Sequence, residues 1–268
     1  MNIFFVSLGC DKNLVDSEMM ITSLRKDGFT ITDREEDAEI IVVNTCCFIG
    51  DAKEESINTL LEMASYKEDG KCRLLVAAGC LAQRYHEEIR TEIPEVDVII
   101  GTMGYEEMGT TLRDALKEKG VVESIRSIDY LPTPLTDRDN TSGGSYAYLK
   151  IAEGCDKHCT YCIIPYARGP IRSREPQEVV AEVKRLAENG FKEVVLTGIH
   201  VASYGKDRRD TSLLDILKQV HEVEGIERIR FSSIEPNVVT EEFAQTMAAL
   251  PKVCDHFHLS LQSGCDKT

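Results

Sequence analysis

The first 125 residues alternate short apolar runs with longer stretches of helical periodicity. Four runs rich in β-branched and apolar side chains occupy residues 2–8, 38–44, 73–78 and 96–100. Between and after them, apolar positions recur at helical spacing over about 14–28, 52–66, 82–91 and 104–119. Strands that alternate with helices at this interval predict a parallel sheet with helices on its faces.

This periodicity stops after the fourth helix and resumes near residue 146. Residues 120–144 contain Pro132, Pro134 and a Ser-Gly-Gly triplet, a composition typical of a linker. A second alternation follows, with strands predicted at 146–152, 193–198, 228–233 and 256–261 and helices near 176–189, 211–223 and 240–249. Repeated βα units of this kind predict part of an α/β barrel. We therefore expect an α/β protein with a first domain at 1–125, a linker at 126–144 and a second domain at 145–268.

Composition and charge narrow the class of protein. The sequence has no run of about 18 apolar residues, and its N-terminus lacks the basic start of a signal peptide, so we expect no membrane span and a cytoplasmic protein. The net charge is −15, and residues 1–125 hold 25 acidic against 13 basic side chains. Because affinity for phosphates comes from Lys and Arg, this part is a poor candidate for binding nucleic acid. Residues 145–210 are nearly balanced, with 11 basic and 9 acidic side chains, as in an ordinary mixed surface.

The strongest chemical feature is a C-x3-C-x2-C run, formed by Cys155, Cys159 and Cys162 directly after the predicted strand 146–152. In parallel α/β folds the loops that follow strands carry the chemistry. Three thiolates in one short loop can hold three irons of a [4Fe–4S] cluster and leave the fourth iron open. Zinc, which requires a fourth protein ligand, is the second interpretation. Three buried, unreactive thiols are the third.

Three further cysteines follow three consecutive predicted strands. Cys10, Cys46 and Cys80 are separated by 35 and 33 residues, one βα repeat each, so their thiols should converge at one edge of the sheet. The chain has ten cysteines, and a reducing compartment disfavours structural disulfides, so this group predicts a second cluster site. The alternative is that small apolar cysteines fill buried strands. The remaining four are interpreted as structural: Cys47, Cys72, Cys254 and Cys265.

The surroundings of these cysteines carry specific motifs. They are Ser-Leu-Gly-Cys10, Asn-Thr-Cys46, Gly-Cys80, and Gly154-Cys-x3-Cys-x-Tyr-Cys-Ile-Ile-Pro165 followed by Arg168-Gly169. Together they resemble the radical S-adenosylmethionine (SAM) methylthiotransferases, the MiaB/RimO family, over essentially the whole chain. The resemblance implies a flavodoxin-like N-terminal domain followed by a radical SAM (βα) barrel.

The resemblance also implies two [4Fe–4S] clusters and SAM as cofactors. The cluster at Cys155, Cys159 and Cys162 would bind SAM and cleave it reductively to a radical, with an electron donor such as flavodoxin or ferredoxin. The cluster at Cys10, Cys46 and Cys80 would carry or supply the sulfur that is inserted into an unactivated C–H bond and methylated. Tyr161 matches a residue that lies near the adenine, with packing as its alternative role. Gly198 and Gly264 would let cofactor or substrate approach the backbone, and no catalytic residue is assigned.

The resemblance changes type along the chain. Residues 1 to about 165 resemble the RimO type, which modifies an aspartate of a small-subunit ribosomal protein. Residues from about 166 to 268, including Thr-Gly-Ile-His200 and His-Leu-Ser-Leu-Gln-Ser-Gly264, resemble the MtaB type, which modifies threonylcarbamoyladenosine in tRNA. The change predicts either an intermediate sequence or two related genes that have been joined. By length of match we favour the ribosomal protein as substrate, with tRNA as the alternative.

The family core has about six βα units and a small C-terminal β-barrel, the TRAM domain. Four barrel strands and no TRAM domain are predicted here, so we expect an incomplete core with little or no turnover on its own. Two rival functions stay open. One is a different radical SAM activity, which the first-domain cysteines disfavour, and the other is a non-catalytic, zinc-stabilised binding module.

Overall fold

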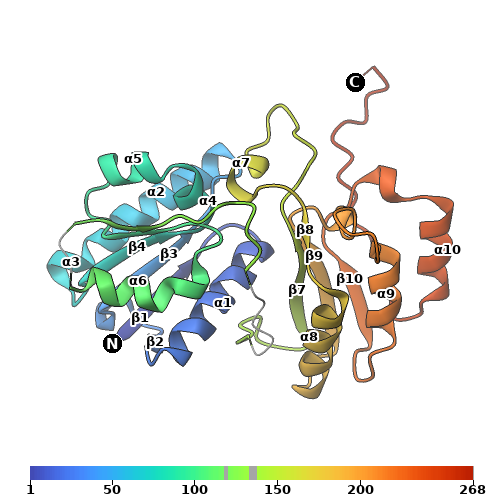
Figure 1. The fold of residues 1–268 in the computed structure, drawn as a ribbon, viewed down its shortest axis with the longest axis horizontal. Helices are drawn as coiled ribbons and strands as arrows, with labels where there is room; N and C mark the ends of the chain where they lie inside the picture. The colour runs from blue at the N-terminus through green and yellow to red at the C-terminus, as the bar shows by residue number, and fades with distance from the viewer. Residues whose placement is uncertain (118–119, 133–137, 268) are drawn as a thin grey trace. The chain divides into compact units, whose positions relative to one another are not determined.

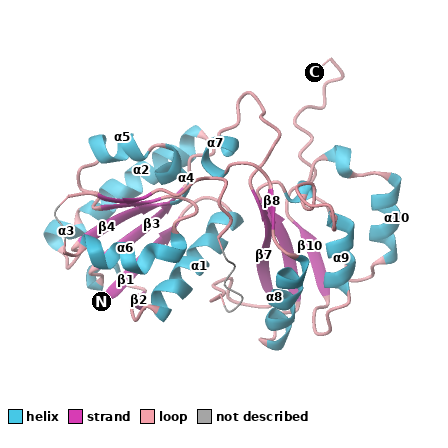
Figure 2. Cartoon of the chain, viewed as in Figure 1, coloured by secondary structure: helices cyan, strands magenta, loops and turns pink. Residues whose placement is uncertain are grey.

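The computed structural model describes residues 1–117, 120–132 and 138–267 (Figures 1 and 2). The described residues form two compact units. The first comprises Met1–Asp139 together with Lys157–Gly169, and the second comprises Asn140–Asp156 together with Pro170–Thr268. The segment 157–169, which carries Cys159 and Cys162, therefore packs with the first unit.

A parallel sheet forms the centre of the first unit, in the order β2-β1-β3-β4-β5-β6. Its strands are β1 (Asn2–Ser7), β2 (Thr30–Thr32), β3 (Ile40–Thr45), β4 (Leu74–Ala78), β5 (Val98–Ile100) and β6 (Val122–Ser124). Every residue of β3, β4 and β5 is buried, as expected for strands covered on both faces. The predicted α/β class and parallel sheet are confirmed. The three-residue edge strands β2 and β6 were too short to produce a pattern.

Helices cover both faces of this sheet, with α1 and α6 on one face and α2, α4 and α5 on the other (Figure 1). The helices are α1 (Asp11–Lys26), α2 (Gly50–Ala64), α3 (Tyr66–Asp69), α4 (Gly79–Arg84), α5 (His86–Glu92), α6 (Met108–Ala115) and α7 (Ile164–Arg168), with 3₁₀ turns η1 (Glu35–Asp37) and η2 (Tyr105–Glu107). The single helix predicted at 82–91 is wrong, because Tyr85 leaves the helical region (φ −128°, ψ 34°) and separates α4 from α5. The helix predicted at 104–119 is η2 followed by α6, and residues 118–119 lie outside the described residues.

The second unit contains a four-stranded sheet in the order β10-β9-β7-β8. The strands β7 (Tyr146–Glu153), β9 (Glu193–Gly198) and β10 (Arg228–Phe231) are parallel, and the two-residue β8 (Arg172–Ser173) is antiparallel to β7. The helices are α8 (Pro176–Glu188), α9 (Leu213–His221) and α10 (Glu241–Ala249), with 3₁₀ turns η3 (Val201–Ser203) and η4 (Pro236–Val238). This succession of βα units is the predicted partial barrel, and it is confirmed.

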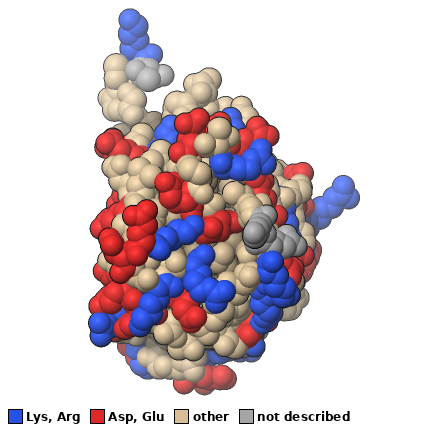
Figure 3. All heavy atoms as spheres, turned by 90° about the vertical axis from the view of Figure 1, so that its left-hand side faces the viewer, with Lys and Arg blue, Asp and Glu red and all other residues tan. Residues whose placement is uncertain are grey.

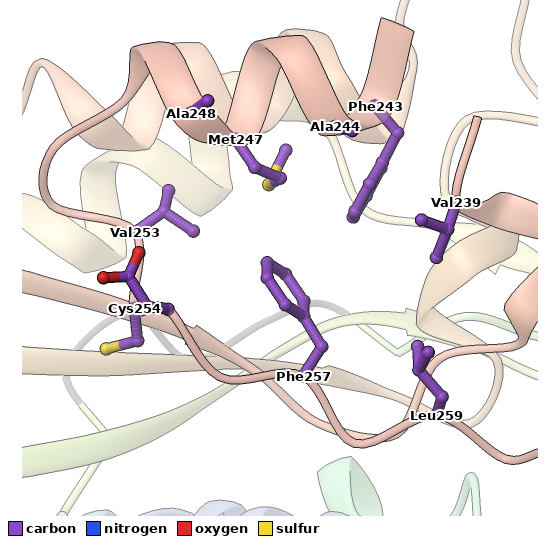
Figure 4. Close-up of a pocket in the computed structure, with 10 residues that line it drawn as sticks. Val239, Phe243, Ala244, Met247, Ala248, Val253, Cys254, Phe257 and Leu259 are labelled. Carbon is purple, nitrogen blue, oxygen red and sulfur yellow. The ribbon is translucent and has the colours of Figure 1, made fainter. Parts of the chain in front are cut away.

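The fourth predicted barrel strand, 256–261, is wrong. The chain after α10 pairs with the chain around β10 through two isolated bridges, Val253 with Ile229 and Leu259 with Ile234, and of these two only Leu259 lies in the predicted strand. The two bridges are five residues apart on one side and six on the other, and an unequal count prevents a continuous ladder. The segment instead faces α10 across an apolar pocket of about 290 Å³, into which Phe243, Met247 and Phe257 project (Figure 4).

Charged side chains of both signs lie on the surface of the protein. On the face shown in Figure 3, Lys and Arg side chains are interspersed with Asp and Glu. Within the described residues, no helix is long and apolar enough to cross a membrane.

Candidate functional site

Cys10, Cys46 and Cys80 lie at the carboxyl edge of the first sheet. Cys10 precedes α1, Cys46 follows β3, and Cys80 is the second residue of α4. Because β1, β3 and β4 are adjacent and parallel, the loops that follow them meet at one edge. The thiols are close enough to interact electrostatically, since charge on Cys10 raises the pKa of Cys46 and charge on Cys46 raises the pKa of Cys80. The structure thus brings together the three thiols that the sequence predicts to converge.

Burial raises the pKa of three thiols near this sheet edge, those of Cys46, Cys47 and Cys80. It raises the pKa of Cys80 to about 11 and that of the neighbouring Cys47 to about 12, and it also raises the pKa of Cys46. The charge of Arg168 acts in the opposite direction on all three. A metal that binds here must therefore displace protons from sulfur. Among the described residues, no three His, Cys, Asp or Glu side chains are already arranged as a metal site, so ligation by these cysteines stays a prediction.

Buried polar side chains fix the loops that carry the three cysteines. The Asn13 amide donates to the carbonyl oxygens of Leu8 and Thr45, both at 3.0 Å. The Asn44 amide donates to Asn13 O at 2.8 Å and to Ser17 Oγ at 2.9 Å. These bonds tie α1 to the ends of β1 and β3, so the backbone around Cys10 and Cys46 is held in place.

Two glycines are required by this close packing. Gly9 has φ +86°, and an ideal Cβ on it would lie 3.0 Å from Cys46 Sγ. Gly79 has φ +89°, and a Cβ on it would overlap the Asn44 side chain. A side chain at either position would meet both backbone strain and a collision. The glycines in Leu-Gly-Cys10 and Ala-Gly-Cys80 therefore allow the cysteine loops to approach one another.

Arg168 is a buried residue of this site that sequence reasoning noted only as part of a motif. Its side chain is 1% exposed. Nη1 donates to Asp16 Oδ2 at 2.6 Å, Nη2 to Asn13 Oδ1 at 2.6 Å, and Nε to Cys80 Sγ at 3.1 Å. Only the structure shows that Asn13, Asp16 and Ser17 of α1, all polar, occupy buried positions. The guanidinium group thus joins α7 to α1 and to one of the three thiols.

The C-x3-C-x2-C segment extends from the second unit into the first. Cys155 is buried, lies two residues after β7 and belongs to the second unit. Cys159 is exposed, Cys162 is half-buried, and both belong to the first unit, where Cys162 N donates to Cys159 O at 2.9 Å. Ligation of one cluster by these three thiols stays a prediction.

Tyr161 borders a pocket within the first unit. Its side chain is 75% exposed, and the pocket has a volume of about 560 Å³. The walls are Cys47, Phe48, Ile49, Gly50, Lys53, Tyr85, Thr160, Tyr161, Cys162, Ile163 and Tyr166. The pocket therefore reaches from Cys162 to the neighbour of Cys46. Aromatic side chains in the wall suit a flat ligand, and adenine contact by Tyr161 stays a prediction.

The structure gives Gly198 and Gly264 different surroundings. An ideal Cβ on Gly198 would lie 3.0 Å from Ala152 O, beside the register shift between β7 and β9. Strand packing thus already requires glycine there, and a role in cofactor binding stays a prediction. A Cβ on Gly264 would meet nothing within 4 Å.

The segment 204–207, which lies within the part of the chain that resembles the tRNA-modifying type, has a structural role in the second unit. The Asp207 carboxylate accepts from Ser173 N at 2.9 Å and from Ser173 Oγ at 2.6 Å, and Tyr204 donates to Arg174 O at 2.9 Å. These bonds hold the segment against β8. Sequence reasoning missed them because the partners are more than 25 residues apart.

Two family models match the chain. The model described as "Uncharacterized protein family UPF0004" matches residues 2–101, and that of the "Radical SAM superfamily" matches residues 149–268. Radical SAM proteins use SAM and a [4Fe–4S] cluster, and a second cluster is typical of the MiaB/RimO proteins, so the predicted cofactors are those of the family.

Comparison with individual proteins agrees with both family models. A solved radical SAM methyltransferase, TsrM from Kitasatospora setae with cobalamin and a [4Fe-4S] cluster bound, shares the fold with a TM-score of 0.59 and 15% identity, over 93% of this chain and 57% of that one. "Ribosomal protein uS12 methylthiotransferase RimO" of Lachnoclostridium phytofermentans is 48% identical over 99% of this chain and 60% of its own length. The protein of the same name from Acetivibrio thermocellus is 45% identical over 98% and 59%. The chain thus spans about three fifths of the length of these curated relatives, and it belongs to the MiaB/RimO family of radical SAM methylthiotransferases.

Proposed function

We propose that the complete protein inserts sulfur into an unactivated C–H bond of an aspartate in ribosomal protein uS12 and methylates that sulfur. The observation that carries this proposal is the meeting of Cys10, Cys46 and Cys80 at one sheet edge, in a chain that also has the C-x3-C-x2-C segment. The substrate is taken from the curated relatives named for uS12, which match residues in both halves of the chain. This substrate would place the reaction in the cytoplasm.

The donor set fits a cluster in the first unit. Cys10, Cys46 and Cys80 offer three sulfur ligands, and Gly9 leaves the space beside Cys46 Sγ free of a side chain. Cys155, Cys159 and Cys162 would hold the other cluster, whose open iron, when loaded, supplies reductive cleavage of SAM. Electrons would come from a small donor protein such as flavodoxin or ferredoxin. The chain's own contribution is to fix the thiols, through Asn13 and Arg168, and to enclose the ligand beside Tyr161.

A zinc-stabilised binding module is the second candidate, and Cys47 is the observation that favours it. Charge on Cys80 or Cys46 raises the pKa of the Cys47 thiol, so a further sulfur lies near two of the three predicted ligands. Four thiols suit tetrahedral zinc. Against zinc, Cys47 is 2% exposed and packs in the apolar core with Leu81 and Ala167. Burial also raises the pKa of its thiol to about 12, compared with about 11 for Cys80.

The test uses the complete protein, purified and reconstituted under anaerobic conditions. About eight irons and eight sulfides per chain are expected from two [4Fe–4S] clusters. Cys80→Ala and Cys159→Ala should each lose about half of this iron, and Cys159→Ala should lose all SAM cleavage. A colourless protein that retains zinc would instead support the binding module.

The substrate is tested separately, with uS12 and tRNA in parallel reactions. Methylthiolated aspartate in uS12 is detected by mass spectrometry of peptides, and methylthiolated nucleosides are detected after digestion of the tRNA. Modification of tRNA alone would overturn the proposed substrate while leaving the two-cluster assignment in place. It would favour the alternative indicated by Thr197–His200 and by the segment that ends at Gly264.

A further inference from the structure

A buried guanidinium group contacts one of the three convergent thiols. Arg168 is 1% exposed, and its charge is balanced by Asp16, which is 5% exposed. A buried charge of this kind is costly unless it is paired and hydrogen-bonded. Asp16 and Asn13 accept bonds from the two terminal nitrogens, which leaves Nε directed at Cys80 Sγ, 3.1 Å away. The sulfur contact thus uses a separate donor from the bonds that anchor the arginine.

The bond from Arg168 Nε to Cys80 Sγ is compatible with metal binding, whereas the contact between Cys80 Sγ and Asn13 Oδ1 is not. As a thiol, Cys80 can donate to Asn13 Oδ1 at 3.6 Å. A cysteine that ligates iron has no proton on sulfur, so it can only accept hydrogen bonds. The contact with Asn13 is therefore lost on ligation, and the Arg168 bond remains. Hydrogen bonds and positive charge at ligand sulfurs stabilise the reduced, more negative state of a cluster.

The position of Arg168 in the sequence connects the two cysteine groups. It ends α7, six residues after Cys162. The same helix end is held by Thr102 Oγ1, which donates to Ala167 O at 3.0 Å, and the arginine bonds to α1 span 152 and 155 residues of sequence. The segment that supplies Cys159 and Cys162 is therefore fastened to the helix that begins beside Cys10.

We propose that Arg168 is the positioning residue of the site formed by Cys10, Cys46 and Cys80, and that its bond to Cys80 raises the reduction potential of the cluster held there. The inference rests on the proposed function, because it requires that an iron–sulfur cluster bind these cysteines. Asp16 and Asn13 hold the guanidinium in place, and Arg168 acts through Cys80 and does not touch substrate.

The experiment isolates this cluster in the complete protein by using Cys159→Ala as the parent, since that change removes the other cluster. Arg168→Lys and Arg168→Met are added to this parent, and each protein is reconstituted anaerobically. The readouts are iron per chain, the electron paramagnetic resonance spectrum of the reduced cluster and its potential by redox titration. Arg90→Met is the matched control, because the Arg90 side chain is 50% exposed and its ion pair among the described residues is with Glu123, at 3.0 Å.

Arg168→Met should shift the reduction potential of the cluster to a more negative value and alter its electron paramagnetic resonance spectrum. Arg168→Lys should show a smaller shift in the same direction, because lysine keeps the charge but loses the planar N–H group. Arg90→Met should match the parent. If Arg168→Met does not fold, as judged by circular dichroism, the comparison of Arg168→Lys with the parent tests the inference. A folded Arg168→Lys protein with parental potential and spectrum would overturn the inference. A parent that binds no iron would instead overturn the proposed function.

Discussion

The thiol of Cys46 lies directly against Gly9, where an ideal Cβ would be 2.9 Å from Cys46 Cβ and 3.0 Å from Cys46 Sγ. Gly9 also has a φ of +86°, which L side chains rarely adopt. We therefore expect Gly9→Ala to displace Cys46 and to lower the iron bound by the Cys159→Ala protein to well under half. The measurement is iron and sulfide per chain after reconstitution.

Gly28→Ala is the control for this change. Gly28 has the same φ of +86°, but a Cβ on it would meet nothing within 4 Å. Both alanine variants should lose about 1 kcal/mol of stability from backbone strain, and Gly28→Ala should keep its iron. Equal iron loss in the two variants would attribute the effect to strain and not to the contact with Cys46.

The iron content is expected to respond differently to alanine at Cys47 and to alanine at Cys80. Cys47 packs in the apolar core at 2% exposure, whereas the Cys80 sulfur accepts a bond from Arg168 at 3.1 Å. In the Cys159→Ala parent, Cys47→Ala should leave the iron content unchanged and Cys80→Ala should abolish it. Both proteins are compared by metal analysis and visible absorption. Loss of metal in the Cys47 variant would show that a fourth thiol is a ligand, as in a zinc site.

Asp16 and Arg168 form a buried ion pair, and its loss should strongly lower the free energy of unfolding. Asp16→Asn removes the countercharge and leaves the guanidinium buried, at a cost of about 3–5 kcal/mol. The pair Arg25–Asp139 has the same 2.6 Å separation, but its side chains are 52% and 40% exposed. Asp139→Asn should therefore cost about 1 kcal/mol or less. Urea unfolding of the metal-free proteins measures both, and similar losses would contradict the structural role assigned to Asp16.

The length and regularity of each apolar run decided how much of the fold could be predicted. The long apolar runs at 38–44 and 73–78 lie in the sheet interior and were predicted nearly to the residue. Strands β2, β6 and β8 have two or three residues each, which is too few for a periodic signal. The segment 256–261 has strand-like composition, but its register with the chain after β10 fails by one residue.

The same reasoning explains what could be predicted of the site. The convergence of Cys10, Cys46 and Cys80 follows from topology, because each cysteine comes just after a strand and adjacent parallel strands end together. The contacts of Arg168 could not be found this way. Its partners are 152 and 155 residues distant, and in sequence Asp16 and Asn13 look like the solvated side of an ordinary helix.

Glu193 gives the second unit a pH-dependent contribution to stability. Burial raises the pKa of its carboxyl group, but hydrogen bonds from Arg230 at 2.9 Å and Arg228 at 2.8 Å outweigh burial and hold the pKa below its ordinary value of 4.5. A lowered folded-state pKa stabilises the protein above pH 4.5, and this contribution disappears as the pH falls through the folded value. Glu193→Gln should therefore be less stable than the parent at neutral pH.

The difference between the parent and Glu193→Gln in free energy of unfolding should be constant from neutral pH down to about 5 and shrink below 4.5. Denaturant titrations at several pH values measure it. Glu227→Gln is the control, because Glu227 is 64% exposed and pairs with Lys192 at 3.2 Å. A difference that grew on acidification would contradict the assigned role of Arg228 and Arg230.

Tyr161 is expected to contribute to SAM binding through the face of its ring. It borders the pocket that reaches Cys162 and is 75% exposed, so its replacement should disturb the core little. Stacking of a base on an aromatic side chain is worth about 1–3 kcal/mol, so Tyr161→Ala should weaken SAM binding to the loaded, complete protein at least fivefold, and Tyr161→Phe should largely restore it. Equilibrium dialysis with labelled SAM gives the affinities, with iron content as a check that the cluster is intact.

Tyr146, 37% exposed at the start of β7, provides the control variant Tyr146→Ala. Unchanged affinity in Tyr161→Ala would assign Tyr161 to packing, the alternative role considered from the sequence.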